Sequence, residues 1–186
     1  MTVIINLKTM YKKLIFIFVT IFISNIAFAS NSKFMEEINN LAENGYVDAQ
    51  YNLARIYSNG ESVDQDLKLA SYWFLRAAEQ GNRDAQYQLA RMFESGLGVT
   101  VDPTEAFKWY KLSAEQGSIE AQYSLGLAYR FGIGVDQNFT QSLRWYKSSA
   151  SKGHSGSQYN LNLLYEEGLA TRKDISDAIK WYRCGR

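Results

Sequence analysis

Apolar residues in the middle of the chain fall into stripes with the 3.6-residue period of an amphipathic α-helix. One stripe, with the spacing i, i+4, i+7 and i+8, consists of Ala49, Leu53, Ile56 and Tyr57. A second stripe, with small residues that allow a neighbouring helix to approach closely, consists of Ala70, Trp73, Ala77 and Ala78. The pattern therefore predicts two packed helices, here named helix A and helix B.

This two-helix unit recurs every 36 residues without an insertion. The residues that keep the spacing include Gly45, Gly81, Gly117 and Gly153; Tyr51, Tyr87, Tyr123 and Tyr159; and Trp73, Trp109, Trp145 and Trp181. A fixed period of this length decides the architecture of the whole chain. We therefore predict four repeats, at residues 45–80, 81–116, 117–152 and 153–186.

Residues 30–44 fit an isolated helix B that caps the N-terminal end of the repeats. The segment Leu41-Ala42-Glu43-Asn44-Gly45 lines up with Ala77-Ala78-Glu79-Gln80-Gly81 at the end of the first helix B. The sequence thus predicts nine helices, one cap and four pairs.

Glycines and short polar residues mark the helix ends. The expected end of helix A, where a left-handed residue suits glycine, is at Gly60, Gly96, Gly132 and Gly168. The expected N-caps of helix B are Asp66, Asp102, Asn138 and Asp174. Pro103 follows Asp102, and Glu105 predicts a capping box at this helix start.

The motifs of the second repeat resemble the Sel1-like repeat family, a relative of tetratricopeptide repeats. They are Asp84-Ala85-Gln86-Tyr87-Gln88-Leu89, Gly96-Leu97-Gly98-Val99, Glu105-Ala106-Phe107-Lys108-Trp109-Tyr110 and Ser113-Ala114-Glu115-Gln116-Gly117. The resemblance covers residues 45–186 and implies an all-α fold, a right-handed α-solenoid of antiparallel helix pairs. Repeat four departs from the pattern at Gly156, Ser157, Ala170 and Thr171, as terminal repeats often do.

The first 29 residues have the pattern of a cleaved signal peptide. Lys8, Lys12 and Lys13 precede an apolar run at 14–23, and Ala27-Phe28-Ala29 supplies the small residues that signal peptidase accepts. The run is shorter than the roughly 20 residues of a membrane-spanning helix. We therefore expect export to the periplasm and no integral membrane segment after cleavage, with an uncleaved anchor or secretion beyond the cell as alternatives.

The charge balance argues against a nucleic-acid-binding protein, and the cysteine content excludes a protein stabilised by intramolecular disulfides. The chain has 20 basic and 19 acidic residues, and loss of three lysines with the leader leaves 17 against 19, a net charge of −2. Such a balance offers no electrostatic surface for nucleic acid. Cys184 is the single cysteine, so an intramolecular disulfide cannot form and packing must supply the stability.

One motif is compatible with an enzyme. Some cysteine-rich exported relatives in the Sel1-like family have been linked to penicillin binding and β-lactamase activity, and Ser149-Ala150-Ser151-Lys152 matches the Ser-x-x-Lys motif of such enzymes. Ser149, however, is in register with Ala77 and Ser113 on the packing stripe of helix B, and no Lys-Thr-Gly or Ser-Asp-Asn completes the site. We expect no catalytic site, no metal site and no cofactor.

Residues that vary from repeat to repeat on the outer face of helix A are the candidates for partner binding. The positions at i, i+3 and i+7 on this face are Asn52, Arg55 and Asn59; Gln88, Arg91 and Ser95; Ser124, Leu127 and Phe131; and Asn160, Leu163 and Glu167. We call these twelve residues the helix A stripe. It changes from basic and polar to apolar, a composition typical of interface centres. The alternative is that Leu127, Phe131 and Leu163 pack on a neighbouring repeat.

These features predict an exported scaffold or adaptor that binds another protein or a peptide segment on its helix A face. The family resemblance also suggests an immunity protein that neutralises a periplasmic toxin effector such as a lipase. A hydrolase acting on β-lactams or peptidoglycan is the third hypothesis, which the missing motifs disfavour.

The leader pattern makes a direct prediction: the exported protein begins at Ser30. N-terminal sequencing of the protein recovered from the periplasm checks it. A product that retains the apolar run at 14–23 would show that the leader is an anchor.

Overall fold

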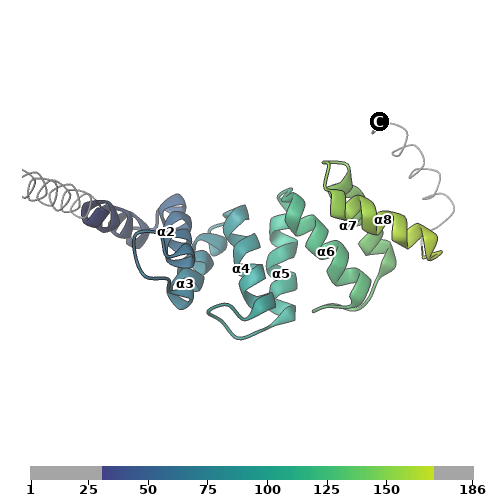
Figure 1. Cartoon of the computed structure of the whole chain (residues 1–186), viewed down its shortest axis with the longest axis horizontal. Coiled ribbons are helices and arrows are strands. Elements are labelled where there is room, and N and C mark those ends of the chain that lie inside the picture. The colour runs from purple at the N-terminus through teal and green to yellow at the C-terminus, as the bar shows by residue number, and fades with distance from the viewer. Residues whose placement is uncertain (1–30, 170–186) are drawn as a thin grey trace, which may run out of the picture.

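The computed structural model describes residues 31–169, and residues 1–30 and 170–186 lie outside the described part. A helix over residues 31–43 is followed by seven more, and residues 31–169 contain no strand. The seven are α2 (Val47–Asn59), α3 (Leu67–Glu79), α4 (Arg83–Ser95), α5 (Pro103–Glu115), α6 (Ile119–Phe131), α7 (Phe139–Ala150) and α8 (Ser155–Glu166). They succeed one another along the long axis of the molecule (Figure 1). The predicted all-α solenoid of helix pairs is confirmed; the leader and helix B of repeat four fall outside the described residues.

The core follows the predicted stripes. Ala49, Leu53 and Ile56 of α2 are at most 8% exposed, and so is Trp73 of α3. In register with Trp73, Trp109 and Trp145 are half-buried and pack against the clusters formed between neighbouring repeats. Each helix pair thus contributes to the core of the next, and burying an aromatic side chain in this way contributes about 1.5–3 kcal/mol.

Helix ends agree with the predicted caps, with one correction. Helices α2, α4 and α6 end at left-handed glycines. Asp102 accepts hydrogen bonds from the amides of Thr104 and Glu105, each at 3.0 Å. The predicted capping box is wrong, because the amide of Asp102 donates instead to the carbonyl of Phe93 at 2.9 Å, and the Glu105 carboxylate pairs with Lys108.

Buried glutamines connect the repeats and form what we call the glutamine ladder. Gln50 Nε2 donates to the carbonyl of Ala42 at 3.0 Å, while its Oε1 accepts from Gln80 at 2.7 Å. One repeat later, Gln86 donates to Ala78 at 3.1 Å and accepts from Gln116 at 2.8 Å. Gln122 donates to Ala114 and accepts from Lys152. Each of these three glutamines therefore joins the ends of two successive B helices, the helix at 31–43 serving as the first.

The loops between helix A and helix B touch the preceding repeat. Gly98 has φ +73°, and a Cβ at this position would lie 2.0 Å from the carbonyl oxygen of Leu67, the first residue of α3. Gly134 has the same relation to Pro103, the first residue of α5. The first repeat has no preceding α-helix pair, and there Ser62 adopts the left-handed conformation with φ 72°. Glycine is therefore required at this loop position in the second and third repeats, where the loop meets a B helix of the repeat before it.

This contact predicts a large difference between two glycine substitutions. Gly98→Ala meets both a positive φ, which costs about 1–2 kcal/mol for a residue with a side chain, and the Leu67 carbonyl. Gly81→Ala meets only the first cost, because no atom lies within 4 Å of its added Cβ although its φ is +88°. Urea unfolding should show a much lower midpoint for Gly98→Ala than for Gly81→Ala. Equal midpoints would mean that the loop is not packed on α3.

Candidate partner-binding surface

The A helices present the helix A stripe on one side of the solenoid. Since α2, α4, α6 and α8 begin at residues 47, 83, 119 and 155, residues in register face the same way. Asn52, Arg55 and Asn59 are exposed, as are Arg91 and Ser95, and Gln88 is half-buried. The stripe in the first two repeats is thus accessible, as the sequence predicts.

Two arginines of the stripe lie over tyrosine rings of their own helix. The guanidinium carbon of Arg55 lies 6.0 Å from the ring centroid of Tyr51, and Arg91 has the same relation to Tyr87. At this distance the cation is attracted by the π face of the ring. The half-buried tyrosines therefore border the stripe, and sequence reasoning missed them as surface residues although each stands four residues before its arginine.

The stripe changes character in the third and fourth repeats. Ser124 is half-buried, and Leu127 packs against the cluster that contains Leu143, Tyr146, Leu161 and Leu164. Phe131 is 58% exposed. Leu163 is half-buried as well. The alternative of packing on a neighbouring repeat therefore holds for Leu127 and not for Phe131.

Asn160 is the one residue of the stripe that is buried. It is 9% exposed, its Oδ1 accepts from Arg130 at 2.9 Å, and its Nδ2 donates to the carbonyl of Gly156 at 2.9 Å. Glu167 is itself exposed, but both its carboxylate oxygens accept from Arg130, at 2.7 and 2.9 Å. These two side chains fasten α8 to the buried Arg130 of α6, so a partner would have to compete for them.

The position of Arg130 recurs in the other repeats with different chemistry. Glu94, one repeat earlier, accepts a hydrogen bond from the Tyr110 hydroxyl at 2.7 Å. Burial and then this carboxylate raise the pKa of Tyr110. In the third repeat, burial raises the pKa of Tyr146 to about 12, and the Arg130 charge opposes the rise. Helix A therefore carries either sign of charge at this position near its C-terminal end, while a tyrosine of the following helix B packs in the same place.

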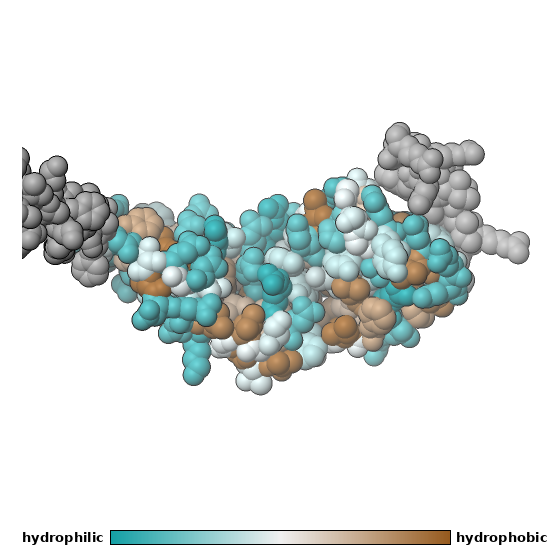
Figure 2. Space-filling view, in the orientation of Figure 1, coloured by the Kyte–Doolittle hydropathy of each residue, from teal (hydrophilic) through white to brown (hydrophobic). Residues whose placement is uncertain are grey.

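Exposed apolar side chains gather in two other places. One is the row of loops between α4 and α5 and between α6 and α7, where Leu97, Val101 and Ile133 are at least 42% exposed. Figure 2 shows hydrophobic surface along this lower rim. The other is the N-terminal end, where Phe34, Leu41 and Tyr46 are exposed and which the sequence did not single out.

The Ser-x-x-Lys motif is part of the packing between helices. Ser149 is fully buried, and its hydroxyl donates to the carbonyl of Ile119 at 3.0 Å, as Ser113 does to Arg83 one repeat earlier. Lys152 Nζ donates to the Gly117 carbonyl at 3.0 Å. This arrangement gives the serine hydroxyl and the lysine amine separate hydrogen bonds to backbone carbonyls of the preceding repeat boundary.

The remaining chemistry of the described residues is structural as well. The ring of His154 caps α8, with Nδ1 accepting from the Ser157 amide at 3.0 Å. Within residues 31–169, no group of three metal-ligating side chains comes together. None of the helices in that range is both long and apolar enough to cross a membrane.

The family model described as Sel1 repeat matches residues 47–82, 83–118, 119–154 and 155–185. The chain belongs to the Sel1 repeat family. The matched units begin two residues after the repeats that we predicted. Among curated proteins, none matches the chain.

Solved structures with Sel1-like repeats resemble the chain. A protective antigen of uropathogenic Escherichia coli strains, with an SLR fold, is 38% identical with a TM-score of 0.74 over 80% of this chain. The chain spans about a third, 32%, of the length of that antigen. A Sel1 repeat protein from Oxalobacter formigenes is 35% identical with a TM-score of 0.64, covering 70% of this chain and 98% of its own.

A more distant structure, cysteine rich protein B of Helicobacter pylori, shares the fold. It is 16% identical with a TM-score of 0.53, and the match covers 69% of this chain and 92% of that one. Proteins built from Sel1 repeats are in general scaffolds for protein–protein interaction, and this chain has that architecture.

The buried arginine gives a test of the connection between α6 and α8. Glu167→Ala leaves the guanidinium of Arg130 with fewer partners inside the protein, which should lower the free energy of unfolding by about 1–3 kcal/mol. Glu166→Ala, the matched control, changes an exposed neighbour and should stay within about 0.5 kcal/mol of the parent. Thermal unfolding of both variants distinguishes them, and equal losses would contradict the pairing.

Proposed function

We propose that the protein is an exported scaffold that binds a segment of another protein on the helix A stripe. The observation that carries the proposal is the contrast between fixed and varied positions. Residues that pack between repeats, such as Gln50 and Tyr51, recur at every period. The stripe positions change along the chain: the exposed Arg55 and Arg91 are followed in register by Leu127 and Leu163, and the exposed Phe131 stands where the other repeats have Asn59, Ser95 and Glu167. In a solenoid, only such positions are free to specify a partner.

The chemistry of the stripe favours a partner with two kinds of contact. Arg55 and Arg91, each near a tyrosine ring, present guanidinium groups that suit carboxylates or backbone carbonyls. Phe131, with the Arg130 guanidinium carbon 5.2 Å from its ring centroid, presents an exposed apolar ring. A segment that is acidic at one end and apolar at the other would complement this surface.

Export to the periplasm is the setting we propose for this binding. Its support is the lysine-rich start, the short apolar run and the Ala-Phe-Ala site in the first 29 residues. The partner would then be a periplasmic protein or the periplasmic part of a membrane protein.

Arg91→Ala and Phe131→Ala test the stripe. Truncating an arginine at an interface centre costs about 2 kcal/mol or more of binding, whereas an exposed change alters stability by no more than about 0.5 kcal/mol. We expect unchanged melting temperatures and loss of the partner that the parent protein captures from periplasm. Binding is read quantitatively, as the Kd for the purified partner.

Arg76→Ala is the matched control, because Arg76 is an exposed arginine on helix α3 rather than on a helix A. It should bind like the parent. Retained binding by both stripe variants would move the interface off the helix A face.

A further inference from the structure

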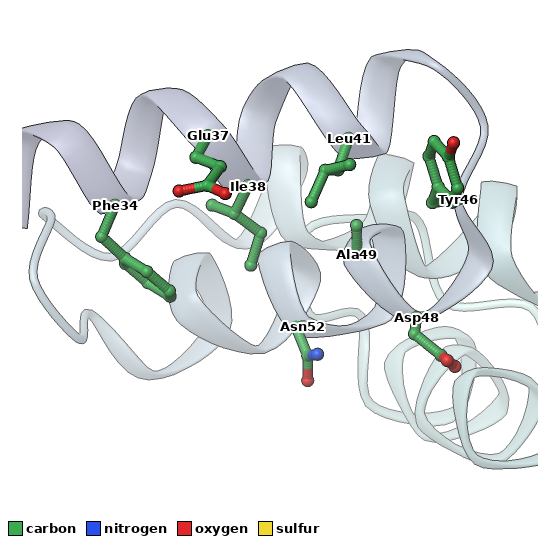
Figure 3. A pocket seen from close by; sticks show the side chains of 8 residues that line it. All are labelled: Phe34, Glu37, Ile38, Leu41, Tyr46, Asp48, Ala49 and Asn52. Carbon is green, nitrogen blue, oxygen red and sulfur yellow. The ribbon is translucent and has the colours of Figure 1, made fainter.

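The N-terminal end of the solenoid carries a hollow between the helix at 31–43 and α2. It has a volume of about 420 Å³ and is lined by Phe34, Glu37, Ile38, Leu41, Tyr46, Asp48, Ala49 and Asn52 (Figure 3). For comparison, an apolar cavity of about 150 Å³ is large enough to bind benzene. Its rim is apolar and open, since Phe34 is 51%, Leu41 40% and Tyr46 62% exposed.

The same place in the next repeats is filled by a tyrosine from the preceding helix A. Phe74 and Asp84 are in register with Ile38 and Asp48 of the hollow, and Tyr51 of α2 packs on Phe74 with ring centroids 5.9 Å apart. Burial raises the pKa of Tyr51, and the charge of the nearby Asp84 raises it further. The tyrosine therefore packs on Phe74 and is close enough to Asp84 to sense its charge.

The third repeat shows the arrangement again. Tyr87 of α4 packs on Tyr110 at 5.8 Å, and the charge of Glu120 adds to the rise of its pKa that burial causes first. Tyr110 and Glu120 are also in register with Ile38 and Asp48. The hollow is thus a seat for a helix A that no helix within residues 31–169 occupies.

Three residues at the hollow have larger side chains than their counterparts in the next repeat. Phe34, Leu41 and Tyr46 stand where the next repeat has Ala70, Ala77 and Asn82. Asn82 caps α4 by accepting from the Ala85 amide at 2.8 Å, whereas Tyr46 makes no side-chain cap bond to α2. The end of a solenoid normally presents a polar outer face. At the start of α2 an exposed aromatic ring thus replaces a helix-capping side chain, as expected for a surface that another molecule covers.

The charges around the hollow indicate what kind of partner covers it. Glu37 and Asp48 lie at its edge, and Glu36 and Glu43 are exposed on the same helix, where Lys33 is the one basic residue within 31–43. Two copies of this face would bring these carboxylates together. A partner with basic residues beside its apolar contact avoids that repulsion.

We propose that this hollow binds one amphipathic helix of a different protein, seated as α2 sits on α3 and α4. The helix places an aromatic residue, best a tyrosine, over Ile38, and a basic residue one turn away faces Glu37 and Asp48. The site is separate from the helix A stripe except for Asn52, which lines both. Binding in the hollow can therefore be tested independently of binding at Arg91 and Phe131.

A stapled, fluorescein-labelled peptide with the sequence of residues 83–95 serves as the probe, because it carries Tyr87 and Arg91 one turn apart and matches a helix A. Stapling is needed because an isolated helix of this length is marginal in water. Fluorescence anisotropy with the purified protein should give saturable binding. We expect at least a tenfold larger Kd for the peptide in which Tyr87→Ala is made.

Variants of the protein locate the binding. Leu41→Lys and Tyr46→Asn should each raise the Kd at least tenfold, and Tyr46→Asn should melt no lower than the parent because it restores the cap seen at Asn82. Leu112→Lys is the matched control, since Leu112 is 44% exposed on α5, away from the hollow. It should bind the probe like the parent, and so should Arg91→Ala and Phe131→Ala.

Three results would overturn the proposal. One is the absence of saturable binding, and another is an unchanged Kd for folded Leu41→Lys and Tyr46→Asn. The third is a dimer of the parent protein in sedimentation experiments that Leu41→Lys abolishes, which would assign the hollow to a second copy of this chain.

Discussion

A polar side chain buried between repeats is the constraint on which the rest of this solenoid depends. Gln50, Gln86 and Gln122 are at most 4% exposed, so their amides must find partners inside the protein. Each one donates to the B helix before it and accepts from the B helix after it. Because both bonds require neighbouring helices at a fixed height, an insertion within a helix would break them. The glutamines that make these bonds keep the 36-residue spacing of the repeats.

Once the stack is fixed in this way, the two kinds of open surface have different origins. The helix A stripe is open in the first two repeats because its positions there point away from both neighbours, so Arg55 and Arg91 can be replaced without cost to packing. The N-terminal hollow is open because no helix within residues 31–169 packs there, and its lining is in register with an inter-repeat contact. A single architecture thereby supplies one site that is specified by side-chain choice and another that is specified by position in the stack.

Local patterns in the sequence were enough to predict the helix pairs, the left-handed glycines and the N-caps, because each depends on residues within one or two turns. The capping box at Glu105 was wrong because the carbonyl of Phe93 competes for the Asp102 amide across the A–B loop. The hydrogen bond between Arg130 and Asn160 joins residues 30 apart. The equivalent positions of the other repeats do not carry the same pair, so the repeat pattern could not predict this bond. The hollow could not be predicted from the sequence, because it is defined by a helix that residues 31–169 do not supply rather than by a motif.

The close approach of Gly98 to α3 bears on how such a protein can grow by duplication. A second copy of the unit that starts at Gly81 could follow the first, since its loop glycine would again meet the first residue of a B helix. The unit that starts at Gly45 cannot be moved inward in the same way, because Ser62 would bring a side chain to within about 2 Å of a carbonyl where Gly98 and Gly134 bring none. At this loop position the second and third units are therefore equivalent, while the first carries a residue that suits only the start of the row.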